Sequence, residues 1–370
     1  MRRTRLIGTV GRSLPLVLGA VLLLAGVPAV AAPSTQNVTV ASTIPANGDV
    51  NPYGVAVVPA SHGRLTRGDI LVSNFNNAPT TAAPGGQQGR GTTIVEVAPN
   101  GHVRLFATIP ASAAPGGVGL TTALVVLRSG WVVVGSLPTT DGSSATASRG
   151  ALFVLDSRGT VREVITGHGI NGPWDATALD LGGFAEIFVS NVLNGITAGQ
   201  PAATTKGTVV RLGLLLTGPL PRLVSSTVIG NGLSVHTDPA ALVVGPTGVA
   251  LGPDGALYVA DTANSRIAVI RHALTRDEPV DAGAASATVS TSSALNGPLG
   301  LAFAPNGDLL AANGGDNNLV ELSRSGAVRS VRDLDSADPP GGALFGLAVV
   351  NYPSAIYYVN DDTNTLNVLR

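Results

Sequence analysis

Short apolar runs that end in a small polar residue recur six times along the chain. The copies span residues 70–74, 131–136, 187–191, 257–261, 309–313 and 357–360. A polar loop and a second apolar run follow each copy, and a turn that contains Gly often comes next, as at residues 99–101. Gly supplies the positive φ that such hairpin turns need. This recurrence predicts small antiparallel sheets arranged around an axis.

Each unit also begins with a run rich in small residues, which we assign to the innermost strand. Clear examples are residues 52–57, 246–251, 298–303 and 344–349. Small residues at these positions would let several strands crowd together at a common axis. The sequence therefore predicts an all-β protein, a six-bladed β-propeller whose blades are four-stranded antiparallel sheets.

The last unit ends early, because its third strand, residues 365–369, is followed only by Arg370. Residues 36–42 near the start alternate as a strand does and have no hairpin partner nearby. Pairing of this segment with the last unit would close the ring and remove an exposed sheet edge. We expect that closure.

Long connections rich in Gly, Ala, Thr and Pro separate some of the runs. They span residues 79–91, 139–150, 195–206 and 273–294. We interpret them as mobile surface connections, and an organised lid is the alternative.

The first residues have the pattern of an export signal. Four arginines at positions 2, 3, 5 and 12 precede an apolar stretch at residues 14–26, and Ala29-Val30-Ala31 has the spacing of a cleavage site. We expect a signal peptide over residues 1–31 and a single propeller domain over residues 32–370. Localisation would then be periplasmic or extracellular. An uncleaved membrane anchor is the alternative.

The charge balance bears on partners. Loss of the four leader arginines leaves 18 basic and 23 acidic side chains, a net charge of −5, and no basic run remains. That balance argues against binding to nucleic acid. The chain has no cysteine, so burial must supply its stability. We expect a monomer that binds a small molecule or a protein and has no membrane contact once the leader is removed.

Candidate site residues gather where the second strand of each unit ends and the first begins. The six strand ends would form a ring of oxygen atoms at the channel mouth: Asn74, Ser136, Asn191, Asp261, Asn313 and Asn360. Trp174 and Asp175 replace the small residues of the other opening strands and would face the same mouth. His168 and His236 lie in connections on that face, where an imidazole could act as a general base or a metal ligand. Alternatively, both are surface residues.

Residues 248–267 resemble a near-consensus NHL repeat, and residues 300–321 resemble a weaker one. NHL repeats are similar to those of gluconolactonase-like and strictosidine-synthase-like six-bladed propellers. These families include lactonases, lyases and binding scaffolds, so the resemblance implies the fold far better than a function.

The resemblance also implies a candidate metal site. Gluconolactonase-like propellers hold an axial divalent metal through Asn, Asp and Glu, and Asn191, Asp261 and Asn313 match such positions. Ca²⁺ suits a set of hard oxygen ligands. The first opening strand reads Tyr53-Gly54 and lacks the expected Glu. The alternative is that Asp261 and Asn264 form a turn in which their side chains bond to backbone amides.

Two functions follow from these observations. The first is an exported propeller that binds a ligand or partner at the top face of the channel. The second is a divalent-metal-dependent lactonase or lyase with His168 or His236 as its base. Motifs for a nucleophilic serine, a phosphate loop or a zinc site are absent from the sequence.

Overall fold

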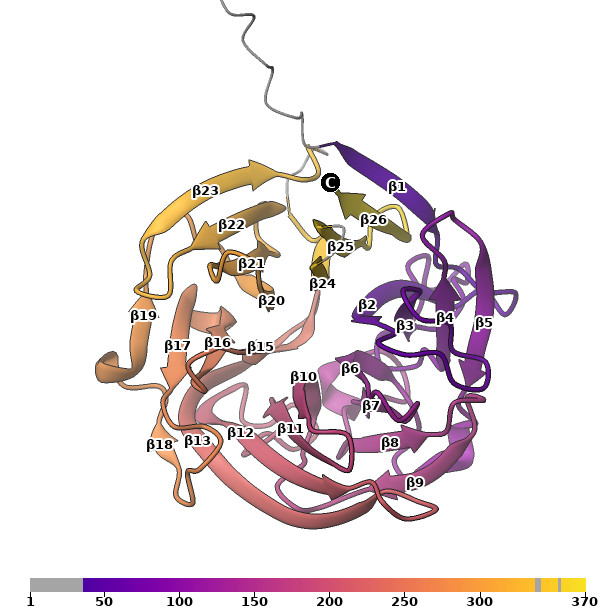
Figure 1. Ribbon diagram of the computed structural model, residues 1–370, viewed down its shortest axis with the longest axis horizontal. Coiled ribbons are helices and arrows are strands. Elements are labelled where there is room, and N and C mark those ends of the chain that lie inside the picture. Colours follow the sequence, from indigo (N-terminus) through magenta and orange to yellow (C-terminus); the bar gives the residue numbers. More distant parts are fainter. Residues whose placement is uncertain (1–35, 337–340, 352–353) are drawn as a thin grey trace, which may run out of the picture. The chain divides into compact units, whose positions relative to one another are not determined.

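The repeated runs form blades whose strands pair in the order in which they occur in the chain. The computed structural model describes residues 36–336, 341–351 and 354–370, and Gln36–Arg370 form one compact unit. Figure 1 looks down the axis of this unit, and the first strand of every blade lies innermost. The first blade contains β2 (Val50–Val57), β3 (Ile70–Asn76), β4 (Thr93–Val97) and β5 (Val103–Thr108), and the second contains β6 (Leu120–Val126), β7 (Val132–Ser136), β8 (Ala151–Leu155) and β9 (Val161–Ile165).

The fourth and fifth blades repeat this plan. Short 3-10 helices occur only in the connections, at Ala111–Ala113, Ser144–Thr146, Thr262–Asn264 and Ala285–Ala287 among the described residues. The strands are β15 (Pro246–Leu251), β16 (Leu257–Asp261), β17 (Arg266–Ile270) and β19 (Thr288–Ser290) in the fourth blade, and β20 (Pro298–Phe303), β21 (Leu309–Asn313), β22 (Asn318–Leu322) and β23 (Val328–Asp333) in the fifth.

The third blade departs from the predicted four strands. Its outer pair is long, with 13 residues in β12 (Ala203–Leu215) and 17 in β13 (Arg222–Asp238). They follow β10 (Pro173–Asp180) and β11 (Phe184–Asn191). Two short strands pair with β13, namely β14 (Leu242–Val244), which is antiparallel, and β18 (Val280–Asp281), which is parallel. The sheet therefore has six strands, because β14 and β18 both pair with the edge of β13 that β12 leaves free.

The predicted closure by the N-terminal strand is confirmed. The sixth blade contains β24 (Leu344–Asn351), β25 (Ser354–Asn360), β26 (Thr365–Leu369) and β1 (Asn37–Ser42), so its outermost strand comes from the start of the described chain. Residues Gln36 and Arg370 exchange backbone hydrogen bonds of 2.9 and 3.1 Å. The Tyr358 hydroxyl donates to Asn37 Oδ1 at 2.5 Å. The fold class, a six-bladed propeller closed in this way, matches the prediction.

The cores lie between blades, not within them. Successive side chains of a strand point to opposite faces of its sheet, so each blade packs against both neighbours. In β7, for example, Val132 and Val134 join the cluster shared with the first blade, whereas Val133 joins the cluster shared with the third. Among the described residues, six clusters of this kind lie between neighbouring blades, and a seventh lies at the axis around Tyr53.

Glycines let the innermost strands approach one another. A Cβ at three of these positions would collide with a backbone carbonyl of the next blade: Gly248 with Leu299, Gly300 with Phe345, and Gly346 with Tyr53. The last contact joins the sixth blade to the first. The small residues that predicted crowding at the axis are therefore required by it.

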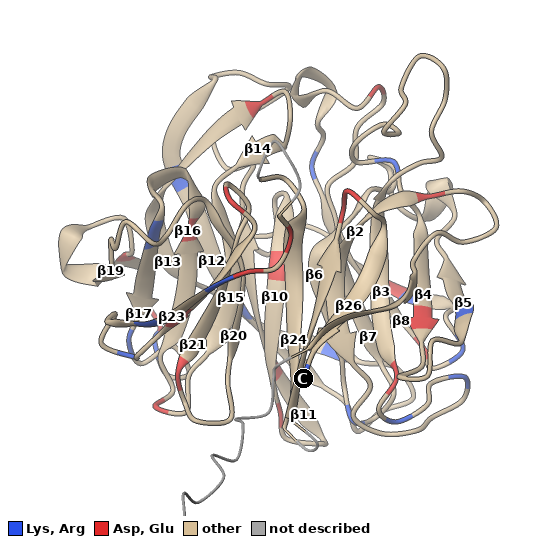
Figure 2. Ribbon diagram, turned by 90° about the horizontal axis from the view of Figure 1, so that it is seen from above, with Lys and Arg blue, Asp and Glu red and all other residues tan. Residues whose placement is uncertain are grey.

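The blades define two faces of the ring. We call the face where the innermost strands begin the connection face, and the face where they end the hairpin face. Figure 2 shows the ring from its side, with β14 at one end and the turn that follows β10 at the other. The sequence placed its candidate site on the connection face.

Some loops on the connection face are tied to one another by hydrogen bonds. The Gln87 side chain donates to the carbonyl oxygen of Asp141 at 3.2 Å, and Arg90 donates to that of Thr140. Gln88 donates to the carbonyl oxygen of Ala240 at 2.8 Å, which links the loop of the first blade to the turn between β13 and β14. These bonds join loops of the first, second and third blades.

The predicted leader, residues 1–31, lies outside the described residues. Within the part of the chain that the structure describes, no helix has the length and apolar character needed to cross a membrane.

Candidate functional site in the axial channel

An axial cavity of about 420 Å³ lies between the innermost strands of all six blades. Its walls come from the later halves of β2, β6, β10, β15, β20 and β24. The cavity therefore occupies the part of the channel nearer the hairpin face. Its side chains are mostly aliphatic, such as Leu124, Leu301 and Leu347, and two of the lining residues are acids, Asp175 and Asp180.

Asp175 is held in place at the inner part of this cavity by neighbouring strands. Its Oδ2 accepts the backbone N–H of Val249, in the next blade, at 2.9 Å. Its own N–H donates to Ser190 Oγ at 3.1 Å, and that hydroxyl donates to the carbonyl oxygen of Thr247 at 2.7 Å. Burial raises the pKa of Asp175 to about 7, against the lowering effect of the N–H groups of Val249 and Ala176. The third blade thus presents a positioned carboxyl group that changes charge near neutral pH.

An aromatic cluster fills the axis nearer the connection face. Tyr53 stacks on Phe75 and Phe345, with ring centroids 4.6 and 4.2 Å apart. Trp174 lies against the same group, at 5.8 Å from Tyr53 and 6.2 Å from Phe75. Tyr53, Phe75 and Trp174 are buried, and Phe345 is half-buried. Trp174 therefore acts as a core residue at the position that the sequence assigned to the channel mouth.

The hairpin formed by β13 and β14 of the third blade contributes to this cluster. Leu242 and Val243 of β14 are buried in it, together with Val235 of β13. Loop residues of the second and third blades, among them Ala147 and Ile196, also pack there. The long β13 thus carries apolar side chains to the end of the axis nearer the connection face.

The six strand-end residues occupy equivalent positions in the backbones of their blades. Each of them pairs with the first or third residue of its neighbouring innermost strand, as Asn191 pairs with Pro173 and Asn313 with Pro298. All six are buried. No hydrogen bond joins any two of their side chains within residues 36–336, 341–351 and 354–370.

Five of the six side chains bond to the connection that enters their own blade. Ser136 Oγ accepts the N–H of Gly119 at 3.0 Å, and Asn191 Oδ1 accepts the N–H of Asn171 at 2.8 Å. The amide groups of the other three donate: Asn74 to the carbonyl oxygen of Thr43, Asn313 to that of Ala294, and Asn360 to the Asp335 carboxylate. The ring of polar residues predicted from the sequence thus fastens successive blades.

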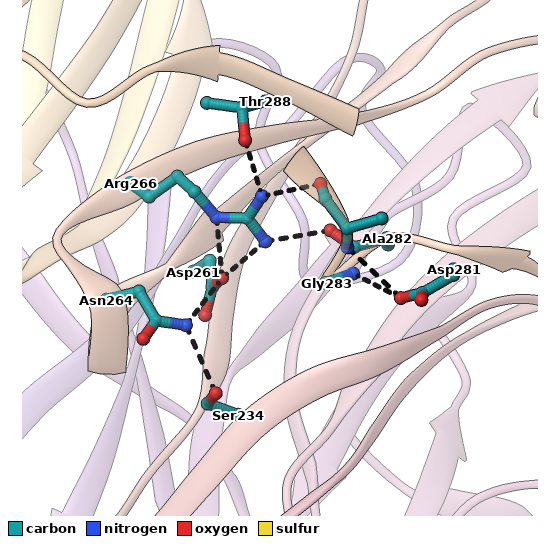
Figure 3. Close-up of polar contacts among 9 residues, drawn as sticks. Ser234, Asp261, Asn264, Arg266, Asp281, Ala282, Gly283 and Thr288 are labelled. Carbon is teal, nitrogen blue, oxygen red and sulfur yellow. Dashed lines mark hydrogen bonds and ion pairs between the residues drawn. The ribbon is translucent and has the colours of Figure 1, made fainter. Parts of the chain in front are cut away.

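Asp261, the sixth residue, binds an arginine of its own blade. Arg266 donates to Asp261 Oδ2 through Nε at 2.9 Å and Nη2 at 2.6 Å (Figure 3). Asn264 donates to the same oxygen at 3.0 Å. Arg266 also donates to the carbonyl oxygens of Ala282 and Ala284. The turn at residues 261–266 is therefore held by bonds among side chains, whereas the sequence suggested bonds from side chains to backbone amides.

The implied divalent metal does not fit the residues proposed for it. Asn191 Oδ1 already accepts a backbone N–H, and the Asp261 charge is neutralised by Arg266. Asp261 Oδ1 and Asn313 Oδ1 are buried without a hydrogen-bond partner among the described residues, which leaves two free oxygens in the proposed set. The part of the chain described here also contains no group of three His, Cys, Asp or Glu side chains arranged for a metal. A Ca²⁺ ion needs six to eight convergent oxygens, and this set does not provide them.

Both candidate histidines lie away from the cavity lining. His168 is exposed in the turn before β10, at φ 52°, and its carbonyl oxygen accepts the Ser226 hydroxyl at 2.5 Å. His236 is half-buried in β13, where it pairs with Ala203 and Val244. Neither side chain lines the axial cavity.

Asp180, the second acid of the cavity, is not among the site residues that the sequence predicts, whereas Asp175 is. A signal was present, since the opening strand of the third blade carries acids near both ends where the other opening strands are apolar. Asp180 ends β10 and accepts the N–H groups of Arg128 at 2.5 Å and Gly182 at 2.8 Å.

Comparisons with known proteins agree with this architecture. The NHL repeat family matches residues 244–270, which contain the near-consensus repeat recognised in the sequence. No match is found among curated protein sequences. A gluconolactonase from Xanthomonas campestris has a similar structure, with a TM-score of 0.54 and 14% identity over 90% of this chain and 89% of its own.

Two further similar structures differ in the ligand that their descriptions mention. The PQQ-bound aldose sugar dehydrogenase from Streptomyces coelicolor has a TM-score of 0.52 and 15% identity, over 91% of this chain and 98% of its own. The calcium-binding regucalcin from Agrobacterium tumefaciens has a TM-score of 0.50 and 14% identity, over 90% and 93%. At these identities the likeness concerns the fold alone. The chain is therefore a six-bladed β-propeller that contains an NHL repeat and is similar in fold to gluconolactonase-like propellers.

Proposed function

We propose that this protein binds a small molecule in the axial cavity and that the molecule enters from the hairpin face. One observation carries the proposal: six strand edges enclose about 420 Å³ around a carboxyl group that neighbouring strands hold in position. Small-molecule sites are typically concave, of about 300–1,000 Å³, with few polar groups and perturbed pKa values among them. The volume of the cavity, its few polar side chains and the raised pKa of Asp175 meet these criteria.

The proposal moves the ligand away from the connection face, where the sequence analysis expected it. On that face Tyr53, Phe75 and Trp174 occupy the axis, and a ligand there would have to displace their buried rings. Five of the strand-end residues bond to the connections that enter their blades, and Asp261 binds Arg266. The hairpin half of the channel requires no such rearrangement.

A thermal-shift screen with a panel of neutral, anionic and cationic metabolites tests this function. Thr177 lines the cavity, and the substitution Thr177→Trp would fill part of it. Thr217 is exposed in the hairpin after β12, so Thr217→Trp is a matched control. We expect at least one compound to stabilise the wild type and the control but not Thr177→Trp. If every stabilising compound acts equally on all three proteins, or if none acts, the proposal fails. Should Thr177→Trp not fold, Asp175→Asn replaces it.

A metal-dependent lactonase or lyase is the second candidate, and its support is the fold of the gluconolactonase-like neighbours. The residues described above do not supply a metal site or a histidine beside the cavity. Elemental analysis of the purified protein, combined with lactone hydrolysis before and after EDTA treatment, tests this candidate. A stoichiometric divalent ion and EDTA-sensitive hydrolysis would favour it over ligand binding.

We further propose that the protein is exported after cleavage at Ala31 and acts as a monomer without binding nucleic acid. The arginines and apolar stretch of the leader and the acidic charge balance support these proposals. N-terminal sequencing of the protein recovered from periplasm or medium tests the first. Light scattering and filter binding at low salt test the others.

A further inference from the structure

The charge of the axial cavity restricts what can bind there. Asp175 and Asp180 are the only ionisable side chains among the described residues that line it, and no basic side chain does so. Both acids lie on β10, five residues apart, which corresponds to about 16 Å along the strand. A ligand in this channel therefore meets negative charge without a compensating protein cation.

The two carboxylates differ in the hydrogen bonds that they already accept. Both oxygens of Asp180 accept backbone N–H groups, from Arg128 and Gly182, so this residue closes the turn after β10. Asp175 Oδ2 accepts the N–H of Val249, the N–H of Ala176 also acts on this carboxylate, and no ion pair or side-chain donor reaches it among the described residues. Asp175 is therefore the group with capacity for a further donor from a ligand.

The walls supply both apolar contacts and acceptors. Aliphatic side chains such as Leu124 and Leu347 line the cavity. The innermost strand of each blade pairs only on its outer side, so its other edge faces the axis with backbone N–H and C=O groups. Such a channel suits an elongated molecule with an apolar body and N–H donors.

From these observations we infer that the channel binds an organic cation, a primary amine or a guanidine, whose charged end donates hydrogen bonds to Asp175. Charge-assisted hydrogen bonds of this kind are about twice as strong as neutral ones. A bare metal ion fits less well, because one carboxylate does not provide the six to eight oxygens that Ca²⁺ requires. The inference rests on the proposed function and specifies its ligand.

Calorimetric titration with three cations, 1-butylamine, agmatine and spermidine, tests this inference, and 1-butanol is the neutral control. The wild type is compared with Asp175→Asn, which keeps an acceptor for Val249, and with Asp180→Asn. We expect at least one amine to bind the wild type, 1-butanol not to bind, and Asp175→Asn to weaken the amine about tenfold or more. Asp180→Asn should have a smaller effect.

Three results would overturn the inference. The first is equal binding of the amine and of 1-butanol, and the second is amine affinity unchanged in Asp175→Asn. The third is an absence of amine binding while the thermal-shift screen finds a neutral or anionic compound that Thr177→Trp excludes. In that third case ligand binding in the channel stands and only the cation is wrong. If neither experiment finds a ligand, both the function and the inference fail.

Discussion

Arg266 donates two hydrogen bonds to Asp261 in the interior of the fourth blade, from Nε and Nη2 to a single carboxylate oxygen. The Asp261 side chain is fully buried, and that of Arg266 is 7% exposed. Sequence reasoning had offered Asp261 as a channel or metal ligand. The structure gives it a partner two residues beyond the 3-10 helix Thr262–Asn264, and that partner also reaches the connection near β18. The Asp261–Arg266 ion pair therefore joins the turn between β16 and β17 to the connection near β18.

Removal of Arg266 should destabilise the protein strongly. In Arg266→Leu, the Asp261 carboxylate would be left buried without a counter-charge, a situation that costs about 3–5 kcal/mol in proteins. Chemical denaturation measures the change in the free energy of unfolding.

The double variant Asp261→Asn/Arg266→Leu is the control, because it removes the unpaired charge together with the arginine. We expect it to recover part of the lost stability. A single variant as stable as the wild type would show that the pair does not hold this turn.

Removal of β1 should open the ring. The strand makes five registered pairs with β26, and cross-strand pairs contribute about 0.2–1 kcal/mol each. A chain that begins at Thr43 should therefore unfold at a lower temperature than one that begins at Gln36, and it should aggregate more readily because β26 becomes an exposed edge. Melting curves and light scattering compare the two chains. Superimposable melting curves would contradict closure by this strand.

Gly346 should not tolerate a side chain. A Cβ there would collide with the Tyr53 carbonyl oxygen, at the contact between the sixth and first blades. Overpacking of this kind costs about 1–3 kcal/mol. Gly85 has no neighbour within 4 Å of an added Cβ, so Gly85→Ala is the matched control and should be close to neutral. Denaturation midpoints that fall equally in both variants would refute crowding at the axis as the cause.

Stability should fall as pH rises from about 4 to 7 because of two buried acids. Burial raises the pKa of Asp175 to about 7, and burial with the nearby Asp362 charge raises that of Asp361 to about 7. Between those pH values the unfolded chain releases protons that the folded protein retains, so rising pH favours unfolding. Above pH 7 the contribution is lost and the effect levels off.

Single variants isolate each share of this pH dependence. Asp175→Asn and Asp361→Asn should each raise the melting temperature relative to the wild type more at pH 8 than at pH 4. The comparison within each pH removes the contribution of other acids. A variant-minus-wild-type difference that is constant with pH would show that the acid in question titrates normally.

The fold could be predicted from the sequence because its determinants are local and repeated. Alternation, turn glycines and the small residues of the opening strands recur in most units, and each repeat constrains the same backbone. The early end at Leu369 and the unpartnered strand near Gln36 then left one solution for closure. No repeated pattern predicted the length of β13, which pairs with β14 just after it and with β18 much later in the chain.

The site was harder to predict, because strand position does not fix what a side chain contacts. Asn191 and Asn313 lie in equivalent backbone positions, as the sequence indicated, yet each bonds to the connection entering its own blade. The contacts that decide this come from segments about twenty residues away. Trp174 lies in the innermost strand of its blade, but its burial depends on Tyr53 and Phe75 in another blade.

The most direct measurement is a crystal structure of the protein soaked with a compound that the thermal-shift screen identifies. Our account predicts that the compound lies in the axial cavity between β10 and its neighbours, within hydrogen-bond distance of the Asp175 carboxylate, with the aromatic rings around Tyr53 unmoved. A compound bound on the connection face beside Asn191, Asp261 and Asn313, with the cavity empty, would contradict it.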